Sequence, residues 1–411
     1  MVLTRRSATT AIALLTVFGA PVPAFADDDI LIGYHGPLTG PASWVGLGGR
    51  DGALLAAAEI NANGGIRGRK LRLIAYDDAN KPSEAEAVAK KMIDGDKVFA
   101  ILGGAGSNTA VILAEEAKRN KVPYINGSAA SPKIMDTGSR WVFSGATIDV
   151  RDIAENEAAF VGEYLKVKKV AYLHTADEFS KPLADSVIKI LKDKYGVETL
   201  VRETYNRGDL DFGSQLIAIR RANPEFLLLS GAYVETARII RQARELGMHL
   251  GIKGDTASMN SGLLVIAGPA AEGTYVEYVA PYFNGDPNEN MVKFESRYRQ
   301  AYPGYPSDRP NYVDALNYGN IYAIAEAIKR AGTPPNPKSF VEALETLSNF
   351  KPSDFLPSAV DVIMPLTFTS SHNGNRRMTH FRVQHGVFMR VEDFSAPVPS
   401  TAFPSNNSLE W

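Results

Sequence analysis

The sequence predicts an α/β protein with two lobes, each built on a doubly wound parallel sheet, and three observations lead to this fold class. First, short apolar runs alternate with helix-like runs along most of the chain, which is typical of parallel strands joined by helical crossovers. Second, the runs Val98–Leu102, Val170–His174 and Phe226–Ser230 are almost continuously apolar, as strands covered on both faces are. Third, a chain of 411 residues is too long to fold around one compact core, so two domains of about 150–200 residues are expected.

The predicted elements follow one another in a regular order from the first strand onward. That strand is expected at Ile30–Tyr34, and the helix Gly52–Asn61 follows it with alanine and leucine side chains on one face. The alternation of strands and helices then continues as far as Leu246. The elements expected in this stretch are Leu71–Tyr76, Ser83–Asp94, Val98–Leu102, Ala110–Asn120, Tyr124–Asn126, Arg151–Leu165, Lys169–His174, Lys181–Lys194, Glu198–Tyr205, Phe212–Ala222, Phe226–Ser230 and Glu235–Leu246.

The composition changes near Pro281, where the chain becomes richer in Tyr, Pro and Asn. The last part of the sequence, residues 395–411, is rich in proline and small polar residues and is expected to lie on the surface. Between these two points we expect helices at Asn290–Tyr302, Asn311–Ala331 and Pro337–Leu347, and strands at Pro365–Thr369 and Thr379–Val391.

The first 26 residues are predicted to be a secretory signal peptide. Arg5 and Arg6 precede the apolar run Ala11–Ala20, and the small residues Ala24 and Ala26 occupy the usual cleavage positions. The apolar run has roughly half the length that a bilayer span needs. We therefore expect export by the Sec or the Tat route, cleavage near Ala26 and a mature protein in the periplasm. An ordinary buried N-terminal helix is the disfavoured alternative.

Composition and charge exclude several classes of function. The chain contains no cysteine, so the exported protein has neither disulfides nor a lipid anchored on an N-terminal cysteine. We therefore expect no direct membrane insertion. The formal net charge of −2 gives no overall field that would attract nucleic acid or an anionic membrane.

A dinucleotide-dependent enzyme is the main alternative from a different class. The glycines within residues 46–52 resemble a Rossmann cluster, but about a dozen residues separate them from the strand end at Tyr34, too many for the tight phosphate turn. The sequence also lacks the P-loop, nucleophile-elbow and zinc-protease motifs. His380 and His385 fall on opposite faces of one predicted strand, which argues against a shared metal. We expect no catalysis, no cofactor and no metal.

Three glycine-rich segments follow predicted strands of the first lobe and precede helices. They are Gly36–Gly49, Gly103–Thr109 and Gly127–Pro132. Ligands of open α/β sheets bind at the carboxyl ends of the strands, where helix N-termini present unpaired N–H groups. Such helix ends favour a carboxylate, and glycines allow close approach of the backbone. Each segment alone could be a simple turn, but three successive ones indicate a binding cleft.

Five motifs resemble the substrate-binding proteins of branched-chain amino acid ABC transporters, the Leu/Ile/Val-binding type. They are GPLTG (Gly36–Gly40), INANGGIRGRKL (Ile60–Leu71), YDDANKP (Tyr76–Pro82), IIRQARELG (Ile239–Gly247) and AAEGTYV (Ala270–Val276). The resemblance covers essentially the whole mature chain. It implies a type I periplasmic binding fold, in which two lobes joined by three crossover segments close on a ligand.

The resemblance also implies where each lobe begins and ends. Residues 27–145 and 279–386 would form lobe 1, and residues 146–278 and 387–411 would form lobe 2. The three crossings are expected near Phe143–Thr147, Tyr275–Ala280 and Gly386–Phe388. Both lobes are thus discontinuous in sequence, in agreement with the domain size expected from chain length.

Twelve ligand contacts are carried over from the resemblance. The loop of Gly106, Ser107, Asn108 and Thr109 would hold a ligand carboxylate, and Trp44 would cover the ligand. The other expected contacts are Ser128, Ala129, Ala130, Phe179, Tyr233, Asp255 and Thr256.

This chain departs from the family pattern at positions that matter for an amino-acid ligand. Ala130 replaces a threonine, and the acid that would pair with the ammonium aligns with Thr256, beside Asp255. A buried ammonium needs an acceptor, because burying it unpaired costs several kcal/mol. The leading expectation is therefore a small carboxylate, first of all an aromatic one, with an aliphatic amino acid as the alternative.

The expected mechanism is a hinged clamp that acts as a monomer and delivers its ligand to a membrane permease of an ABC transporter. A receptor that senses the closed form is an alternative partner, which the sequence does not separate from a permease. Two further residues remain open. Arg151 would either face the cleft or form a surface ion pair, and His35 is the histidine expected nearest to the cleft.

Overall fold

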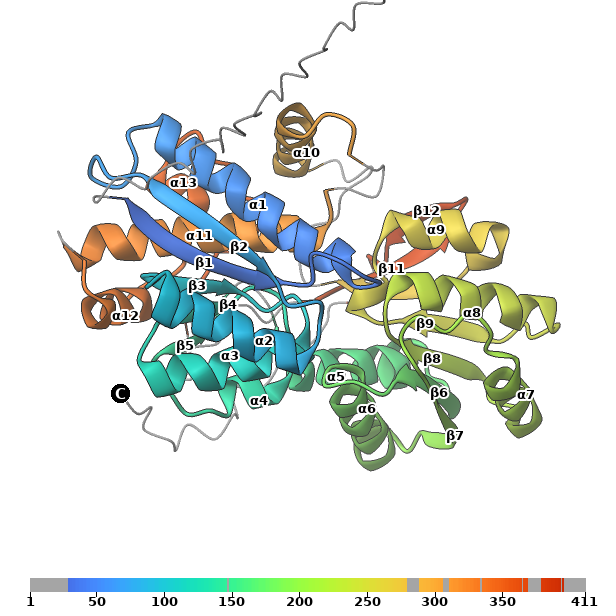
Figure 1. The fold of residues 1–411 in the computed structure, drawn as a ribbon. Helices are drawn as coiled ribbons and strands as arrows, with labels where there is room; N and C mark the ends of the chain where they lie inside the picture. The colour runs from blue at the N-terminus through green and yellow to red at the C-terminus, as the bar shows by residue number, and fades with distance from the viewer. Residues whose placement is uncertain are drawn as a thin grey trace, which may run out of the picture.

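The computed structural model of the chain describes residues 29–145, 148–278, 288–305, 310–332, 335–363, 365–368, 378–392 and 394. Its strands form two separate sheets, each flanked by helices (Figure 1). This arrangement confirms the predicted fold class. The predicted signal peptide, residues 1–26, lies outside the described residues. Within the described ranges, no helix is long and apolar enough to cross a membrane.

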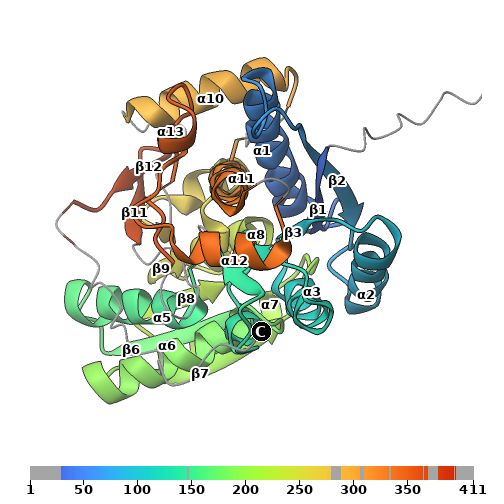
Figure 2. The ribbon, with the colours of Figure 1, turned by 90° about the vertical axis from the view of Figure 1, so that its left-hand side faces the viewer.

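The first lobe contains a five-stranded sheet in which every strand is parallel to its neighbours. Its elements are β1 Ile30–Gly36, α1 Ser43–Ala62, β2 Leu71–Asp77, α2 Pro82–Lys90, β3 Ala100–Gly103, α3 Ser107–Asn120, β4 Tyr124–Asn126, α4 Pro132–Met135, β5 Val142–Ser144, α10 Glu289–Ala301, α11 Tyr312–Ala331, α12 Pro337–Glu345 and α13 Pro352–Phe355. The strand order β2-β1-β3-β4-β5 reverses beside β1, as in other doubly wound sheets. Helices α1 and α11 cover one face and α2 and α3 the other (Figures 1 and 2).

The second lobe contains a seven-stranded sheet with the order β12-β11-β10-β9-β8-β6-β7. Strands β6 to β10 are parallel to one another, whereas β11 is antiparallel to both β10 and β12. The elements of this lobe are α5 Val150–Ala159, β6 Lys169–Thr175, α6 Ser180–Tyr195, β7 Glu198–Tyr205, α7 Gly213–Ala222, β8 Phe226–Ser230, α8 Tyr233–Glu245, β9 Gly251–Gly254, α9 Ser261–Ala267, β10 Tyr275–Tyr278, β11 Thr379–Gln384 and β12 Val387–Arg390.

The position of β11 corrects the predicted lobe boundary at residue 386. That boundary placed Thr379–Gln384 in the first lobe, but β11 pairs with β10 in the second sheet, with Tyr278 opposite Thr379. Gly386 is therefore not a crossing between lobes. It lies in the turn that joins β11 to β12, with φ of 74°, a conformation that glycine adopts readily. No local sequence pattern reveals such a pairing, because the partner strand is distant in the chain.

The other two crossings remain predictions. The expected segments Phe143–Thr147 and Tyr275–Ala280 extend onto residues 146–147 and 279–280, which lie outside the described residues. The predicted strand Pro365–Thr369 is reduced, within the described residues, to a single bridge between Leu366 and Phe350.

The glycines of α1 serve helix packing. A Cβ atom on Gly52 would collide with the backbone carbonyl of Asp314 in α11, and one on Gly46 would collide with the carbonyl of Pro37. Both positions therefore need glycine so that neighbouring backbone can approach. This packing role explains the cluster at residues 46–52 without a phosphate-binding turn.

Candidate ligand-binding site

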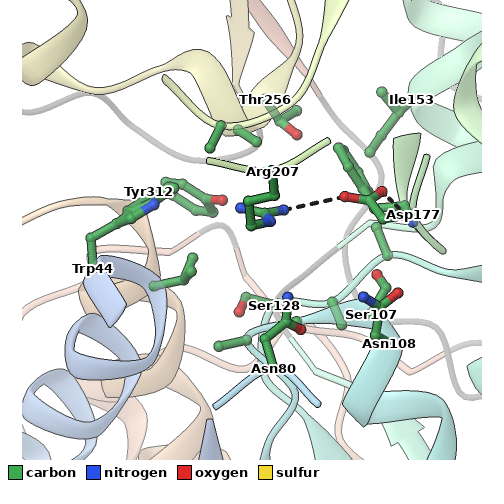
Figure 3. Close-up of a pocket in the computed structure, with 18 of the residues that line it drawn as sticks. Trp44, Asn80, Ser107, Asn108, Ser128, Ile153, Asp177, Arg207, Thr256 and Tyr312 are labelled. Carbon is green, nitrogen blue, oxygen red and sulfur yellow. Dashed lines mark hydrogen bonds and ion pairs between the residues drawn. The ribbon is translucent and has the colours of Figure 1, made fainter. Parts of the chain in front are cut away.

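A cavity lies between the two lobes, at the carboxyl ends of parallel strands from both sheets (Figure 3). Its lining residues come from both lobes, and an interface between domains is a usual place for a small-molecule site. This is also where open α/β sheets bind their ligands. The lining residues are Trp44, Val45, Asn80, Ala105, Gly106, Ser107, Asn108, Ser128, Ala129, Ala130, Ile148, Ile153, Asp177, Phe179, Arg207, Ala232, Thr256, Ala257 and Tyr312.

The N-terminus of α3 forms one end of the cavity. Gly106 precedes the helix in an extended conformation, and no side chain caps the first turn. The N–H groups of a first helical turn have no partners within the helix and carry partial positive charge. A Cβ atom on Gly106 would lie 2.1 Å from Oδ1 of Asn80, so a larger residue here would displace the Asn80 side chain that lies beside this helix end. The resulting geometry suits a carboxylate.

The loop after β4 forms the floor of the cavity and is held by a buried amide. Nδ2 of Asn126 donates to the Ala129 carbonyl at 2.6 Å, and Oδ1 of Asn126 accepts from the Ala129 N–H at 3.1 Å. The carbonyl of Ala130 accepts from the N–H of Val150 in the second lobe at 2.9 Å. These contacts fix the backbone on both sides of Ser128, whose side chain lines the cavity.

His35 lies beneath the binding loops and does not line the cavity. Its side chain is fully buried, with Nδ1 2.9 Å from Asp78 Oδ2 and Nε2 3.1 Å from the Tyr124 hydroxyl. A Cβ atom on Gly103 would collide with the backbone of His35. This network therefore supports the start of the Gly103–Thr109 segment from below, and that His35 is the histidine nearest to the cleft stays a prediction.

Aromatic side chains form the walls of the cavity. Trp44, Phe179 and Tyr312 line it directly. Tyr233 does not line the cavity but packs on Trp44 from the second lobe, with ring centroids 5.2 Å apart and planes at 80°. Edge-to-face pairs of this kind fix ring orientation and add about 0.5–1.5 kcal/mol to area burial. Tyr233 thus positions Trp44 without a cavity contact of its own.

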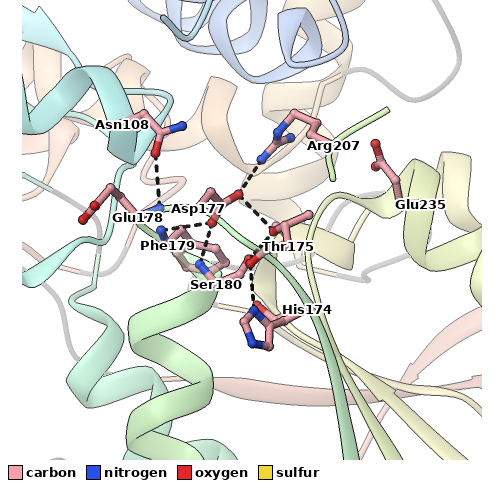
Figure 4. A network of polar contacts seen from close by, with 12 residues as sticks. Asn108, His174, Thr175, Asp177, Glu178, Phe179, Ser180, Arg207 and Glu235 are labelled. Atoms are coloured by element: carbon pink, nitrogen blue, oxygen red, sulfur yellow. Dashed lines mark hydrogen bonds and ion pairs between the residues drawn. The ribbon is translucent and has the colours of Figure 1, made fainter. Parts of the chain in front are cut away.

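Two charged side chains of the second lobe line the cavity, Asp177 after β6 and Arg207 after β7. Arg207 Nη2 lies 3.2 Å from Asp177 Oδ2, which also accepts from the Thr175 hydroxyl at 2.9 Å (Figure 4). Asp177 Oδ1 accepts from the backbone N–H groups of Phe179 at 3.1 Å and Ser180 at 2.7 Å. An ionised carboxylate has about four acceptor sites. All of those on Asp177 are therefore occupied, and the residue caps the start of α6.

Asp255 is fully buried and does not line the cavity. Its Oδ2 accepts from the Ser230 hydroxyl at 2.6 Å and the Gly231 N–H at 3.1 Å. Its Oδ1 accepts from the Ala257 N–H at 2.9 Å and the Ser258 hydroxyl at 3.3 Å. Burial raises the pKa of Asp255 to about 7. Like Asp177, Asp255 caps a helical turn and has its acceptor sites filled.

The cavity brings together nine of the twelve predicted contact residues. Thr109, Tyr233 and Asp255 are the three that do not line it. Thr109 is fully buried and its hydroxyl donates to the Gly106 carbonyl at 3.2 Å. The ten lining residues outside the predicted contacts are Val45, Asn80, Ala105, Ile148, Ile153, Asp177, Arg207, Ala232, Ala257 and Tyr312. Most follow the carboxyl end of a strand, and that position is the one signal that could have found them.

Arg151 forms ion pairs away from the cavity. Its Nη2 lies 2.7 Å from Asp149 Oδ2 and its Nη1 3.1 Å from Asp136 Oδ1, so of the two expected roles the ion pair is the observed one. No group of three His, Asp or Glu side chains able to hold a metal occurs among the residues that the structure describes.

Comparison with known proteins shows the family. A family described as periplasmic binding protein matches residues 29–387. The chain is 29% identical over 333 residues to a leucine-, isoleucine-, valine-, threonine- and alanine-binding protein of Pseudomonas aeruginosa, covering 81% of this chain and 86% of the relative.

Solved structures agree in fold. A leucine-binding protein from Thermotoga maritima superimposes with a TM-score of 0.74 at 24% identity, covering 88% of this chain and 97% of the other. A solute-binding protein of an ABC transporter from R. palustris, solved in complex with benzoate, gives a TM-score of 0.74 at 17% identity, covering 88% and 95%. The chain therefore belongs to the periplasmic binding protein family, among relatives of the Leu/Ile/Val-binding type, and has the type I periplasmic binding fold that its motifs predict.

Proposed function

We propose that this protein is an exported, monomeric solute-binding protein that holds a small carboxylate, first of all an aromatic acid, and delivers it to an ABC permease. The membership of the family supports the general role. The ligand class is argued from the cavity itself, in three steps.

The first step is the site for the carboxylate. The uncapped start of α3 at Ser107 and Asn108 places hydrogen-bond donors at one end of the cavity, beside the hydroxyl of Ser128, which donates to the Gly104 carbonyl at 3.5 Å. A partly buried helix N-terminus stabilises an anion by up to about 2 kcal/mol. Each of these groups can bind the carboxylate of an amino acid as well as that of a simple acid, so this end of the cavity does not distinguish the two ligand classes.

The second step carries the choice: the acids beside the cavity have no acceptor site left for an ammonium group. Asp177 and Asp255 each accept four hydrogen bonds from neighbouring groups. An ammonium ion needs three acceptors, and leaving it unpaired in a cavity costs several kcal/mol. Among the described residues, the amide oxygen of Asn80 lines the cavity without a hydrogen-bond partner, but it is uncharged and supplies one acceptor where an ammonium group needs three. A ligand without an ammonium group fits this cavity better.

The third step concerns the shape of the ligand. Trp44, Phe179 and Tyr312 present flat apolar surfaces, and aromatic rings contribute both large contact area and geometric preference. The solute-binding protein solved with benzoate has this same fold, so the fold can hold such an acid. An aromatic carboxylate would place its charge at α3 and its ring between these side chains.

The clamp mechanism follows from contacts between the lobes at the edge of the cavity. Asn108 Oδ1 of the first lobe accepts from the Glu178 N–H of the second at 3.2 Å (Figure 4), and Lys133 Nζ lies 2.9 Å from Glu178 Oε2. A ligand that contacts both lobes would stabilise this closed arrangement by its higher affinity for it. The closed form is then the state that a permease would recognise.

Isothermal titration of the purified mature protein with benzoate and with leucine tests the ligand class. Binding of benzoate, accompanied by a smaller radius of gyration in X-ray scattering, is the expected result. Tight binding of leucine without binding of benzoate would reject the proposed ligand class and restore the amino-acid alternative. A radius of gyration that no bound ligand changes would reject the clamp.

A further inference from the structure

Four polar residues surround the boundary between the cavity and a second hollow that adjoins it. Asn80 and Asn108 of the first lobe, and Asp177 and Arg207 of the second, line both spaces. Figure 3 shows Arg207 across the cavity from Asn80 and Asn108. Asn108 is the second residue of α3, so the open N–H groups at the start of that helix lie at the same boundary. The carboxylate end of the cavity therefore includes a cation from the second lobe.

The side chain of Asn108 presents a hydrogen-bond donor to this boundary. Its Oδ1 accepts from the Glu178 N–H at 3.2 Å, and an N–H group can donate only to the oxygen of a side-chain amide. The amide nitrogen, Nδ2, therefore points the other way, toward the side on which Arg207 lies (Figure 4). Among the described residues, Nδ2 has no hydrogen-bond partner, so its N–H groups are open to a ligand.

Arg207 also has N–H donors that no protein group uses. A guanidinium group carries five N–H donors in a planar fork that matches the two oxygens of a carboxylate. Within the part of the chain that the structure describes, its one partner is Asp177, 3.2 Å from Nη2. Even if the neighbouring Tyr312 hydroxyl accepted a second N–H, three would remain. The side chain is 29% exposed, so these donors are accessible from the cavity.

The negative charge of Asp177 is compensated locally and does not repel an anion from this boundary. Asp177 Oδ1 accepts from the N–H groups of Phe179 and Ser180 at the start of α6, where the helix dipole stabilises a carboxylate. The boundary thus combines one ion pair with the positive ends of two helices, α3 and α6. An anion that enters from the cavity meets donors of α3, Asn108 and Arg207, and the net field there attracts it.

We propose that Arg207 and Nδ2 of Asn108 bind the ligand carboxylate together with the start of α3, so that both lobes hold the anionic group itself. This inference rests on the proposed function and names the second-lobe residue that recognises the charge. One carboxylate oxygen would accept from α3 and Asn108, and the other from Arg207. Because Arg207 belongs to the second lobe, it reaches the carboxylate only when the lobes are closed. A ligand of the same shape without the charge should therefore bind weakly.

The test measures how strongly the protein prefers benzoate over benzamide, which has the same shape and no charge. Isothermal titration gives both dissociation constants, and the preference is the benzamide value divided by the benzoate value. We expect a preference of about tenfold or more in the unmodified protein. It should be about tenfold smaller in Arg207→Gln, the change typical of losing a hydrogen bond between charged groups. Arg207→Lys keeps the charge without the fork and should show an intermediate preference.

Asn108→Asp is a second variant of almost the same shape. Its carboxylate can still accept from the Glu178 N–H, but it places a negative charge where Nδ2 lies now. We expect benzoate to bind about tenfold more weakly to this variant and benzamide to be affected less. Asn120→Asp makes the same charge change at the far end of α3 and is its control. Arg221→Gln, at an exposed position of α7, is the control for Arg207→Gln. Both controls should keep the full preference.

The outcomes separate this inference from the proposed function. Full preference for benzoate in Arg207→Gln would overturn the role of Arg207 and leave carboxylate binding intact, and full preference in Asn108→Asp would do the same for Asn108. If Arg207→Gln does not fold, Arg207→Lys decides, because a purely structural role would leave its preference unchanged. Equal affinities for benzoate and benzamide in the unmodified protein would overturn charge recognition altogether. Binding of leucine alone would remove the proposed function and this inference with it.

Discussion

Replacing Lys253 with methionine should destabilise the second lobe severely. Lys253 lies on β9 and is fully buried, with Nζ 2.8 Å from Glu277 Oε2 on β10 and 3.4 Å from Glu157 Oε2 on α5. Burial by itself lowers the pKa of a lysine, but the two carboxylates outweigh it and raise the pKa of Lys253 above its usual value. The ammonium therefore stays charged and compensates buried negative charge at the centre of the sheet.

The expected magnitude follows from what the substitution leaves behind. Methionine fills most of the lysine volume but leaves the carboxylate of Glu277, which is 0% exposed, without its ion-pair partner. Removing one partner of a buried ion pair costs about 3–5 kcal/mol. Each kcal/mol lowers the melting temperature of a domain of this size by about 2–4 °C. The unfolding temperature of the second lobe should thus fall by about 6–20 °C.

Differential scanning calorimetry of the ligand-free protein measures this change. Lys192→Met is the matched control, because Lys192 is exposed on α6 and its loss should shift unfolding by less than about 0.5 kcal/mol. Adding Glu277→Gln to the Lys253→Met variant should recover part of the loss, since burial raises the pKa of Glu157 to about 8 and at pH 7 no buried charge then remains unpaired. If Lys253→Met melts within 2 °C of the unmodified protein, roughly the shift for half a kcal/mol, the charge-pairing explanation is refuted.

Three further predictions test the same structure at other points. Burial raises the pKa of Glu157 from 4.5 to about 8, so between these values the folded state keeps a proton that the unfolded state loses. The free energy of unfolding should therefore fall as pH rises from about 5 to 8. Thermal melts of Glu157→Gln over this pH range should show a smaller decrease in melting temperature. Ser128→Ala and Phe179→Ala should weaken benzoate binding by about tenfold each in calorimetric titrations, whereas Ser214→Ala, at an exposed position of α7, should not; unchanged affinity in both variants would mean that the cleft is misplaced. Asp255→Asn should lower the melting temperature by about 2–6 °C through mismatched hydrogen bonds and leave benzoate affinity unchanged; loss of ligand binding without loss of stability would show that this acid contacts the ligand.

Most of the fold could be predicted from the sequence because its signals are local. Apolar runs such as Phe226–Ser230 mark parallel strands buried on both faces, and the helix-like runs between them define the crossovers. The assignment of β11 failed for a physical reason. An antiparallel strand added after a long return segment has no neighbour in the sequence that identifies its sheet, so only the pairing of Thr379 with Tyr278 reveals it.

The candidate site could be predicted only where it is formed by the backbone of loops and helix starts. The segments around Gly106 and Ser128 were found because glycine, serine and helix starts leave a recognisable pattern. Arg207 was missed because a single polar side chain after a strand carries no periodic signal, and Tyr312 because it is one aromatic residue at the start of a helix, α11. Thr109 was expected to contact the ligand, yet its hydroxyl bonds to the turn before its own helix, a competition that is usual for threonine at such positions.

The roles of the two acids beside the cavity follow from the same competition. An aspartate just before a helix either caps the N–H groups of that helix or binds a ligand cation, and it has too few acceptor sites for both. Asp177 accepts from the N–H groups two and three residues ahead, and Asp255 from the N–H two residues ahead, which is the spacing of a cap. With both acids used in this way, neither has an acceptor site left for a ligand cation. An amino acid would therefore leave its ammonium group without a carboxylate partner in this cavity, which disfavours it more strongly than any single substitution at Ala130 or Thr256 does.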